Sequence, residues 1–154
     1  MKIKIFALTH KKFEVPQDKM YQPLQVGREE KEDLGYLCDN TGDNISAENC
    51  YYSELTGLYW IWKNVHTYKY VGTCHYRRYL LNEQEKIFTE AEYLELLKDY
   101  DLITTKRVVL NNSYHYGFAT NHNIHALDMT GEVIKELYPE YYDTFVQLVN
   151  GTET

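Results

Sequence analysis

The stretch YVGTCHYRRYLL, residues 70–81, has two adjacent arginines directly after an apolar, β-favouring run. Side chains with rings or charges cluster there: His75, Tyr76, Arg77, Arg78 and Tyr79. A guanidinium presents a planar fork of N–H donors that matches the oxygen atoms of a phosphate group. Imidazole and phenol rings can stack on a base or a sugar. The cluster predicts a diphosphate site. The alternative is an arginine pair bonded to acidic neighbours, with the tyrosines packed beside it.

A second polar stretch, DNTGDNIS, runs from Asp39 to Ser46. Its carboxylates, Asp39 and Asp43, and its amides and hydroxyls are suited to holding sugar hydroxyls or a metal ion. The order of these residues does not match a calcium loop, which needs a later glutamate and a different spacing. The alternative is an Asx-rich turn that leads into a helix cap.

Two further groups of side chains, on either side of the predicted strand over 102–105, are weaker candidates. Asp99-Tyr100-Asp101 is a literal Asp-x-Asp, a sequence with which many nucleotide-sugar transferases hold a divalent metal. It precedes the apolar run 102–105 instead of following it, so we interpret it as a solvated connection. Lys106 and Arg107 follow that run, either as part of a cationic rim around a phosphate or as a solvated basic pair.

Metal and cofactor motifs are otherwise weak. His122, His125 and Asp128 are spaced to share one helix face, which is slender support for a metal site. No His-Glu-x-x-His, Gly-x-Ser-x-Gly, phosphate loop or Gly-x-Gly-x-x-Gly occurs, so the commonest zinc protease, hydrolase, nucleotide-kinase and dehydrogenase classes are excluded.

Alternating strands and helices are expected to position these residues. Apolar runs predict strands over 3–8, 68–74 and 102–105, with a long loop region over 14–46 that holds one short strand near 36–37. Helices are expected over 46–65, with Tyr51, Leu55, Leu58, Trp62 and Val65 on its apolar face, over 89–100, around 124–137 and after Pro139. This order indicates an α/β fold with a sheet that is at least partly parallel. Ligands of such sheets bind beyond the carboxyl ends of the strands, where His75 to Tyr79 would lie.

Length and composition narrow the class of protein. The 154 residues fit one domain, and 44% apolar residues allow a real core. The three cysteines have no metal or redox spacing, and the amino terminus does not resemble a signal peptide, so we expect a cytoplasmic protein with reduced thiols. The net charge of −7 argues against nucleic acid as a partner. RNA binding through HYRRY at 75–79 and the other tyrosines is kept as an alternative.

Several stretches together resemble one bacterial family, found in capsular and exopolysaccharide gene clusters and generally regarded as glycosyltransferases. The resemblance spans nearly the whole chain. It is carried by THKK at 9–12, YQPLQVG at 21–27, DNTGDNIS at 39–46 with Asn49, YSELTGLYWIWKN at 52–64, Val71-Gly72 with HYRRY at 75–79, and YPEY at 138–141.

The resemblance implies a GT-A-like (Rossmann-like) fold with a mixed, mostly parallel sheet and a nucleotide-sugar donor. It also implies that relatives continue beyond residue 154, so we expect residues 1–154 to be a single transferase domain that is incomplete at its carboxyl terminus. Cations instead of a divalent metal would then neutralise the departing diphosphate. The residues expected to bind substrate are Thr9, His10, Lys11, Asp39, Asn44, Tyr59, His75, Tyr76, Arg77, Arg78 and Lys106. Asp43 and Glu54 are the candidate catalytic bases.

The function expected from these features is sugar transfer from a nucleotide sugar, with UDP and galactose as the favoured donor parts. The acceptor would be a capsular or exopolysaccharide precursor, free or lipid-linked. We therefore expect a cytoplasmic enzyme that works at the inner face of the membrane, in peripheral association with assembly machinery. The alternative is a non-catalytic module that binds a nucleotide sugar or a carbohydrate.

Overall fold

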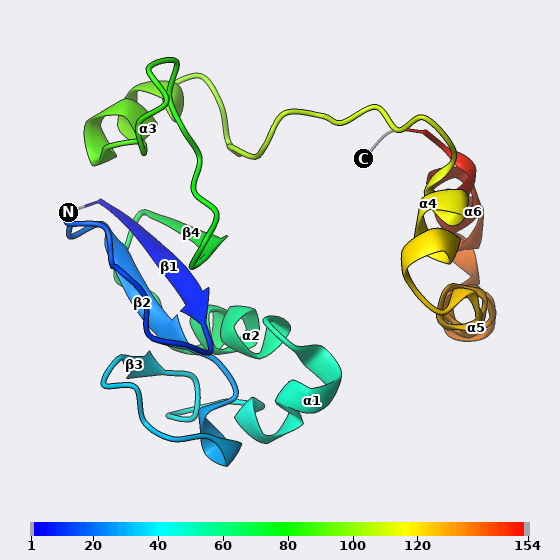
Figure 1. Ribbon diagram of the computed structural model, residues 1–154, viewed down its shortest axis with the longest axis horizontal. Coiled ribbons are helices and arrows are strands. Elements are labelled where there is room, and N and C mark those ends of the chain that lie inside the picture. The colour runs from blue at the N-terminus through cyan, green and yellow to red at the C-terminus, as the bar shows by residue number, and fades with distance from the viewer. Residues whose placement is uncertain (1, 153–154) are drawn as a thin grey trace. The chain divides into compact units, whose positions relative to one another are not determined.

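A computed structural model describes residues 2–152 of the chain (Figure 1). The chain divides into two compact units, Met1–Thr104 and Thr105–Thr154, and each is described by itself below. That residues 1–154 work as a single, incomplete domain stays a prediction.

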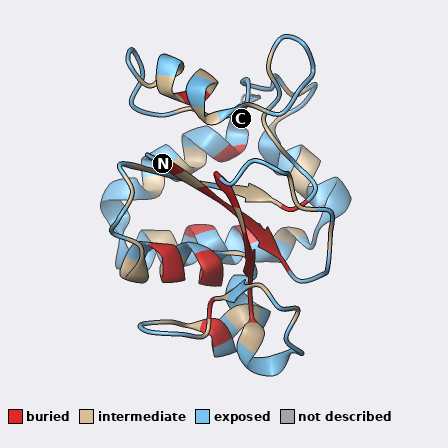
Figure 2. Ribbon diagram, turned by 90° about the vertical axis from the view of Figure 1, so that its left-hand side faces the viewer, coloured by how far each residue is buried: buried red, intermediate tan, exposed pale blue. Residues whose placement is uncertain are grey.

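The first unit contains a four-stranded parallel sheet. Its strands are β1 (Ile3–Thr9), β2 (Tyr21–Gln25), β3 (Leu37–Cys38) and β4 (Tyr70–His75), in the order β3-β2-β1-β4. β1 is the most buried strand and pairs with both β2 and β4 (Figure 2). The predicted α/β class with a parallel sheet is confirmed. Because all four strands point the same way, their carboxyl ends meet at one edge of the sheet.

The sequence analysis missed β2 because Pro23 lies in its middle. Proline lacks an N–H and usually excludes a central strand. Here the Gln25 carbonyl accepts a hydrogen bond from the Asp39 N–H on the β3 side, whereas the Val26 N–H donates to Thr9 on the β1 side. Pro23 is two residues from Gln25 and therefore faces β3, but pairing with β3 begins only at Leu24. The missing N–H thus costs no ladder hydrogen bond.

Helix α2 (Leu55–Asn64) packs against one face of the sheet. The shared core contains Phe6, Leu8, Leu24, Val26, Trp60 and Ile61. Gly57 allows this contact, because a Cβ there would lie 2.7 Å from Val26 Cγ1 and 2.9 Å from Leu8 Cδ2. The glycine therefore permits a close approach of the helix to the sheet.

The predicted continuous helix over 46–65 is wrong in two respects. A 3-10 turn (Ser46–Glu48) and the short α1 (Asn49–Tyr52) precede α2, and Ser53 breaks the helix with a φ of 51°. The predicted apolar face is also wrong, since Tyr51, Leu55, Leu58 and Trp62 are exposed. The face with the small residues Thr56 and Gly57 is buried instead, because it lets the helix approach the sheet closely.

The other face of the sheet carries a second core of Ile3, Ile5, Met20, Tyr21 and Tyr93. Tyr93 comes from α3 (Glu90–Leu96), which lies within the helix predicted over 89–100 and begins with a capping box of Thr89 and Glu92. The predicted strand over 102–105 is wrong: these residues form no strand, and Leu102 is exposed. Only Leu102 and Ile103 of this stretch are apolar, and Ile103 packs against the second core without joining the sheet.

The second unit is helical. It contains α4 (Tyr114–Asn121), α5 (Ile124–Leu137), a 3-10 turn (Pro139–Tyr141) and α6 (Tyr142–Asn150). The helices expected around 124–137 and after Pro139 are confirmed. The sequence analysis missed α4, whose polar and aromatic composition has no apolar face; the Ser113 side chain caps it. No helix within residues 2–152 is long and apolar enough to cross a membrane.

Candidate functional site

A turn after β1 presents the first candidate residues. Thr9 is buried at the end of the strand, and its hydroxyl donates to the Lys11 carbonyl at 2.6 Å and accepts from the Lys11 N–H at 3.0 Å. These two bonds close a tight turn that leaves His10 and Lys11 exposed. Thr9 therefore fixes the backbone of the turn, and the side chains of the next two residues are available to bind a ligand.

Tyr76 joins this turn to the end of β4. Its N–H donates to the Leu8 carbonyl at 3.1 Å, and its side chain is buried. The Tyr76 ring meets the His10 ring edge-on at 5.6 Å, and the Arg77 guanidinium lies 5.1 Å from its centre. The sheet thus brings together residues that are 66 positions apart in the sequence, His10 and Tyr76.

The surroundings of His10 are electropositive. Partial burial lowers the pKa of His10, and positive charge on Lys11, Lys31, His75 and Arg77 lowers it further. All of these groups lie in the first unit: His10 and Lys11 follow β1, Lys31 follows β2, and His75 and Arg77 lie at the end of β4. We call Lys11, Lys31 and Arg77, together with the neighbouring imidazoles of His10 and His75, the cationic cluster. Its lysines and arginine supply the positive charge that suits it to bind an anion.

Lys31 is the member of the cationic cluster that the sequence analysis missed. It belongs to the loop between β2 and β3, and its ammonium donates to Asn49 Oδ1 at 2.8 Å. Since β2 was not predicted, nothing assigned this loop to the edge of the sheet where His10 lies. Recognising YQPLQ as a strand would have been the signal for it.

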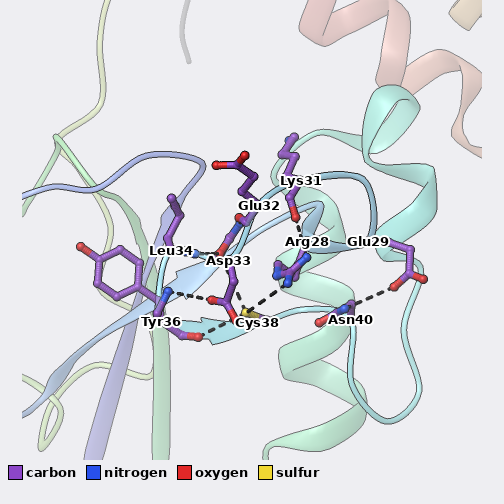
Figure 3. A network of polar contacts seen from close by, with 11 residues as sticks. Arg28, Glu29, Lys31, Glu32, Asp33, Leu34, Tyr36, Cys38 and Asn40 are labelled. Carbon is purple, nitrogen blue, oxygen red and sulfur yellow. Dashed lines mark hydrogen bonds and ion pairs between the residues drawn. The ribbon is translucent and has the colours of Figure 1, made fainter.

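A polar network fixes the shape of this loop (Figure 3). The buried Gln25 side chain donates to the Glu32 carbonyl at 2.7 Å and accepts from the Leu34 N–H at 2.9 Å. The Arg28 guanidinium lies 3.8 Å from the Asp33 carboxylate and also donates to the Lys31 carbonyl. The loop therefore presents Lys31 from a defined backbone.

Asp39 holds the same region together from inside. It is fully buried, and its carboxylate accepts four hydrogen bonds: from Gly27 N at 2.8 Å, Arg28 N at 3.1 Å, Ser46 Oγ at 2.6 Å and Thr56 Oγ1 at 2.7 Å. These bonds tie the end of β2 to α2. The structure thus gives Asp39 a positioning role, because a carboxylate enclosed in this way does not face solvent.

His75 and Glu54 form a pair at the end of β4. His75 Nε2 lies 3.4 Å from Glu54 Oε1, and the Arg77 N–H donates to His75 Nδ1 at 3.2 Å. Because Nδ1 accepts this hydrogen bond, the neutral form of His75 carries its own proton on Nε2, which faces the Glu54 carboxylate. Glu54 immediately precedes α2, so this pair also links the amino end of α2 to the Arg77 turn.

The two candidate bases are not brought together. Asp43 lies at the other end of α2, where it accepts a hydrogen bond from the Tyr59 hydroxyl at 3.0 Å. Lys63 also contacts Asp43. Glu54 and Lys63 are nine positions apart in the sequence, which corresponds to a rise of about 13 Å along the helix. Glu54 is therefore the candidate that lies beside the cationic cluster, and Asp43 and Tyr59 belong to a different surface.

The remaining predicted residues are placed as follows. Arg78 is exposed in the turn after His75. Asn44 closes an Asx turn by accepting from the Ser46 N–H at 3.1 Å, as the alternative for that stretch expected. Lys106 lies in the second unit, no longer after a strand, and its role stays a prediction. Within residues 2–152, no group of three or more His, Cys, Asp or Glu side chains is arranged to hold a metal ion.

Comparison with known proteins adds to this picture. No curated protein matches the chain. Among solved structures, the apo structure of the bifunctional glycosyltransferase WbbM matches all of this chain with a TM-score of 0.81 and 28% sequence identity. The chain spans 32% of the length of that protein. This match supports the resemblance to glycosyltransferases. The family described as "Domain of unknown function (DUF4422)" matches residues 4–154, and the chain therefore belongs to that family.

Proposed function

We propose that this chain forms the donor-binding part of a glycosyltransferase and holds the diphosphate of a nucleotide sugar at the cationic cluster. The observation that carries the proposal is the packing of His10 and Arg77 against Tyr76, where two parallel strands end. The positive charges of Lys11 and Lys31 act on the same place, since they lower the pKa of His10. The likeness to a bifunctional glycosyltransferase over the whole chain supports the same function.

In sugar transfer, the bond between the anomeric carbon and the diphosphate oxygen breaks, and negative charge grows on the leaving group. Preorganised cations stabilise that charge more in the transition state than in the ground state. The Arg77 guanidinium and the two lysines would do so, which leaves no need for a divalent metal in this proposal. The donor is a UDP-sugar, with galactose as the favoured sugar.

Glu54 and His75 supply the second requirement, an activated acceptor hydroxyl. The Glu54 carboxylate is half-exposed and can take the proton of a bound hydroxyl, while His75 holds the adjacent Arg77 turn. We propose Glu54 as the base. The acceptor is a saccharide, free or lipid-linked, in capsular or exopolysaccharide assembly at the inner face of the membrane.

Calorimetric titration with UDP, with and without manganese, tests the donor site. The chain is expected to bind UDP without metal, and Arg77→Ala is expected to weaken binding by about tenfold or more, because one charge-assisted hydrogen bond is lost. Lys86→Ala is the control, since Lys86 is an exposed cation outside the cationic cluster. A folded chain that ignores UDP, or that binds it only with manganese, would contradict the proposal.

A second candidate function is a binding module without turnover. The observation that favours it is the separation of the two candidate bases by the length of α2, together with the span of 32% of the matched structure. Hydrolysis of UDP-galactose, or transfer to an acceptor, distinguishes the two. Turnover that is lost in Glu54→Gln while UDP affinity is kept supports the enzyme.

A further inference from the structure

The carboxyl-terminal half of α2 exposes an aromatic platform outside the cationic cluster. Trp62 is 68% exposed, whereas Trp60, two residues earlier, is 7% exposed and packs in the core. The Tyr59 ring stands edge-on to the Trp62 ring, with 5.7 Å between their centres and 87° between their planes. An indole that stays in water forgoes most of the stabilisation that its burial would bring, so its position calls for an explanation.

Three polar groups surround the platform. The Tyr59 hydroxyl donates to Asp43 Oδ1 at 3.0 Å, and the Lys63 ammonium lies 3.9 Å from Asp43 Oδ2. The same ammonium lies 3.9 Å from the centre of the Trp62 ring. Lys63 lies over the indole ring, yet the Trp62 residue is still 68% exposed, so much of it is open to solvent.

The Asp43 carboxylate is not needed to hold its own loop. The Asn64 side chain accepts from the Asp43 N–H at 3.2 Å and donates to the Asp43 carbonyl at 2.8 Å. The Trp60 indole N–H also donates to the Thr41 carbonyl at 2.9 Å. The backbone is fixed by these bonds, and the Asp43 side chain remains 58% exposed with room for a further hydrogen bond.

We propose that Trp62, Tyr59, Lys63 and Asp43 form a saccharide-binding site. The apolar C–H face of a pyranose would stack on the exposed part of the Trp62 ring, and its hydroxyls would donate to Asp43 and accept from Lys63. One carboxylate beside one ammonium leaves the site without net charge, so the sugar is neutral and not a uronic acid. An aromatic ring with fixed polar groups at its rim loses little conformational entropy on binding.

This site goes beyond the proposed donor site, since it lies in the carboxyl-terminal half of α2, whereas Glu54 lies at the amino end, about 13 Å from Lys63 along the helix. It would hold part of an extended glycan, away from the place of chemistry. Its test uses residues that do not contribute to the cationic cluster, so failure here and failure of UDP binding are separate results.

The test has two parts. Of the two tryptophans, Trp60 is buried, so quenching of indole fluorescence by acrylamide reports mainly on the exposed Trp62. The unmodified chain is applied to an array of galacto-, gluco- and manno-oligosaccharides, with hyaluronan and alginate oligosaccharides as acidic probes. Any neutral series that binds is then titrated into the unmodified chain while indole fluorescence and its quenching by acrylamide are recorded.

At least one neutral series is expected to bind and to protect Trp62 from the quencher. Trp62→Ala should weaken binding by about tenfold and Asp43→Asn by a similar factor, while Trp62→Phe should keep most of the affinity. Tyr100→Ala removes another exposed aromatic side chain of the same unit and should change nothing. The inference is overturned if no neutral series binds, if only acidic glycans bind, or if folded Trp62→Ala binds as the unmodified chain does.

Discussion

Replacing Asp39 by asparagine tests whether one buried carboxylate organises the loops around the site. The four donors to Asp39 are two backbone N–H groups and two hydroxyls, shared two to each oxygen. An asparagine turns one oxygen into an NH2 group, so in either orientation two of the four donors face another donor. Ser46 or Thr56 can rotate its hydroxyl and accept, but the N–H of Gly27 or Arg28 cannot.

The magnitude follows from this count. A hydrogen bond to a charged group contributes about 1.5–3 kcal/mol, and a buried donor without a partner costs about 1–3 kcal/mol. With one backbone donor stranded and the carboxylate charge lost at the other three bonds, we expect Asp39→Asn to lower the free energy of unfolding by about 3 kcal/mol. Urea unfolding followed by Trp60 fluorescence measures it, because Trp60 lies in the core of the same unit.

Asp43→Asn is the matched control, because the same chemical change occurs in an exposed side chain. It should stay within about 0.5 kcal/mol of the unmodified chain. A loss below about 1 kcal/mol for Asp39→Asn would refute the reasoning, since a buried network with a missing acceptor cannot be that inexpensive. The variant should also weaken UDP binding, because the loop that carries Lys31 starts at the backbone bonded to Asp39.

Three further outcomes are expected. Gly57→Ala should destabilise the first unit by about 1 kcal/mol in urea unfolding, because the overpacking cost of about 1–3 kcal/mol exceeds the gain in helix propensity. The control is Gly117→Ala in α4, where an added Cβ would meet no atom within 4 Å, and it should be neutral or stabilising. The pKa of His10 is lowered by burial and cationic neighbours, so as the pH falls through 6.5 the unfolded chain takes up a proton that the folded chain resists. The free energy of unfolding should therefore fall more steeply toward acid pH in the unmodified chain than in His10→Asn. An equal slope in the two proteins would contradict this. Burial raises the pKa of Cys74 to about 12, so mass spectrometry after iodoacetamide treatment near neutral pH should find exposed Cys50 labelled well before Cys74.

The edge of the sheet that carries the site was predictable, and the reason is local. Tyr70–His75 is a β-favouring run that stops at charged residues, and the opening run over 3–8 is apolar except for Lys4, so both strands and their shared edge follow from the sequence pattern. The gathering of His10, Tyr76 and Arg77 follows in turn from parallel pairing.

Other features depended on tertiary contacts that periodicity does not contain. The apolar stripe of Leu55, Leu58 and Trp62 pointed to the wrong face of α2, because the sheet accepts the face with the smallest side chain, Gly57. Lys31 was hidden because Pro23 masked β2. The choice between Asp43 and Glu54 required the course of α2, which sets the two carboxylates at its opposite ends.

The pairing of β1 with β4 has a consequence for the folding of the chain during its synthesis on the ribosome. Ile3 pairs with Tyr70, so the first strand to be made must wait for one that is translated 67 positions later. At about 5–20 residues per second, this delay is roughly 3–13 s, during which the backbone N–H and C=O groups of β1 that face β4 have no strand partner. The nascent chain is then a natural client for chaperones, and slowing translation before residue 70 should increase the fraction that aggregates.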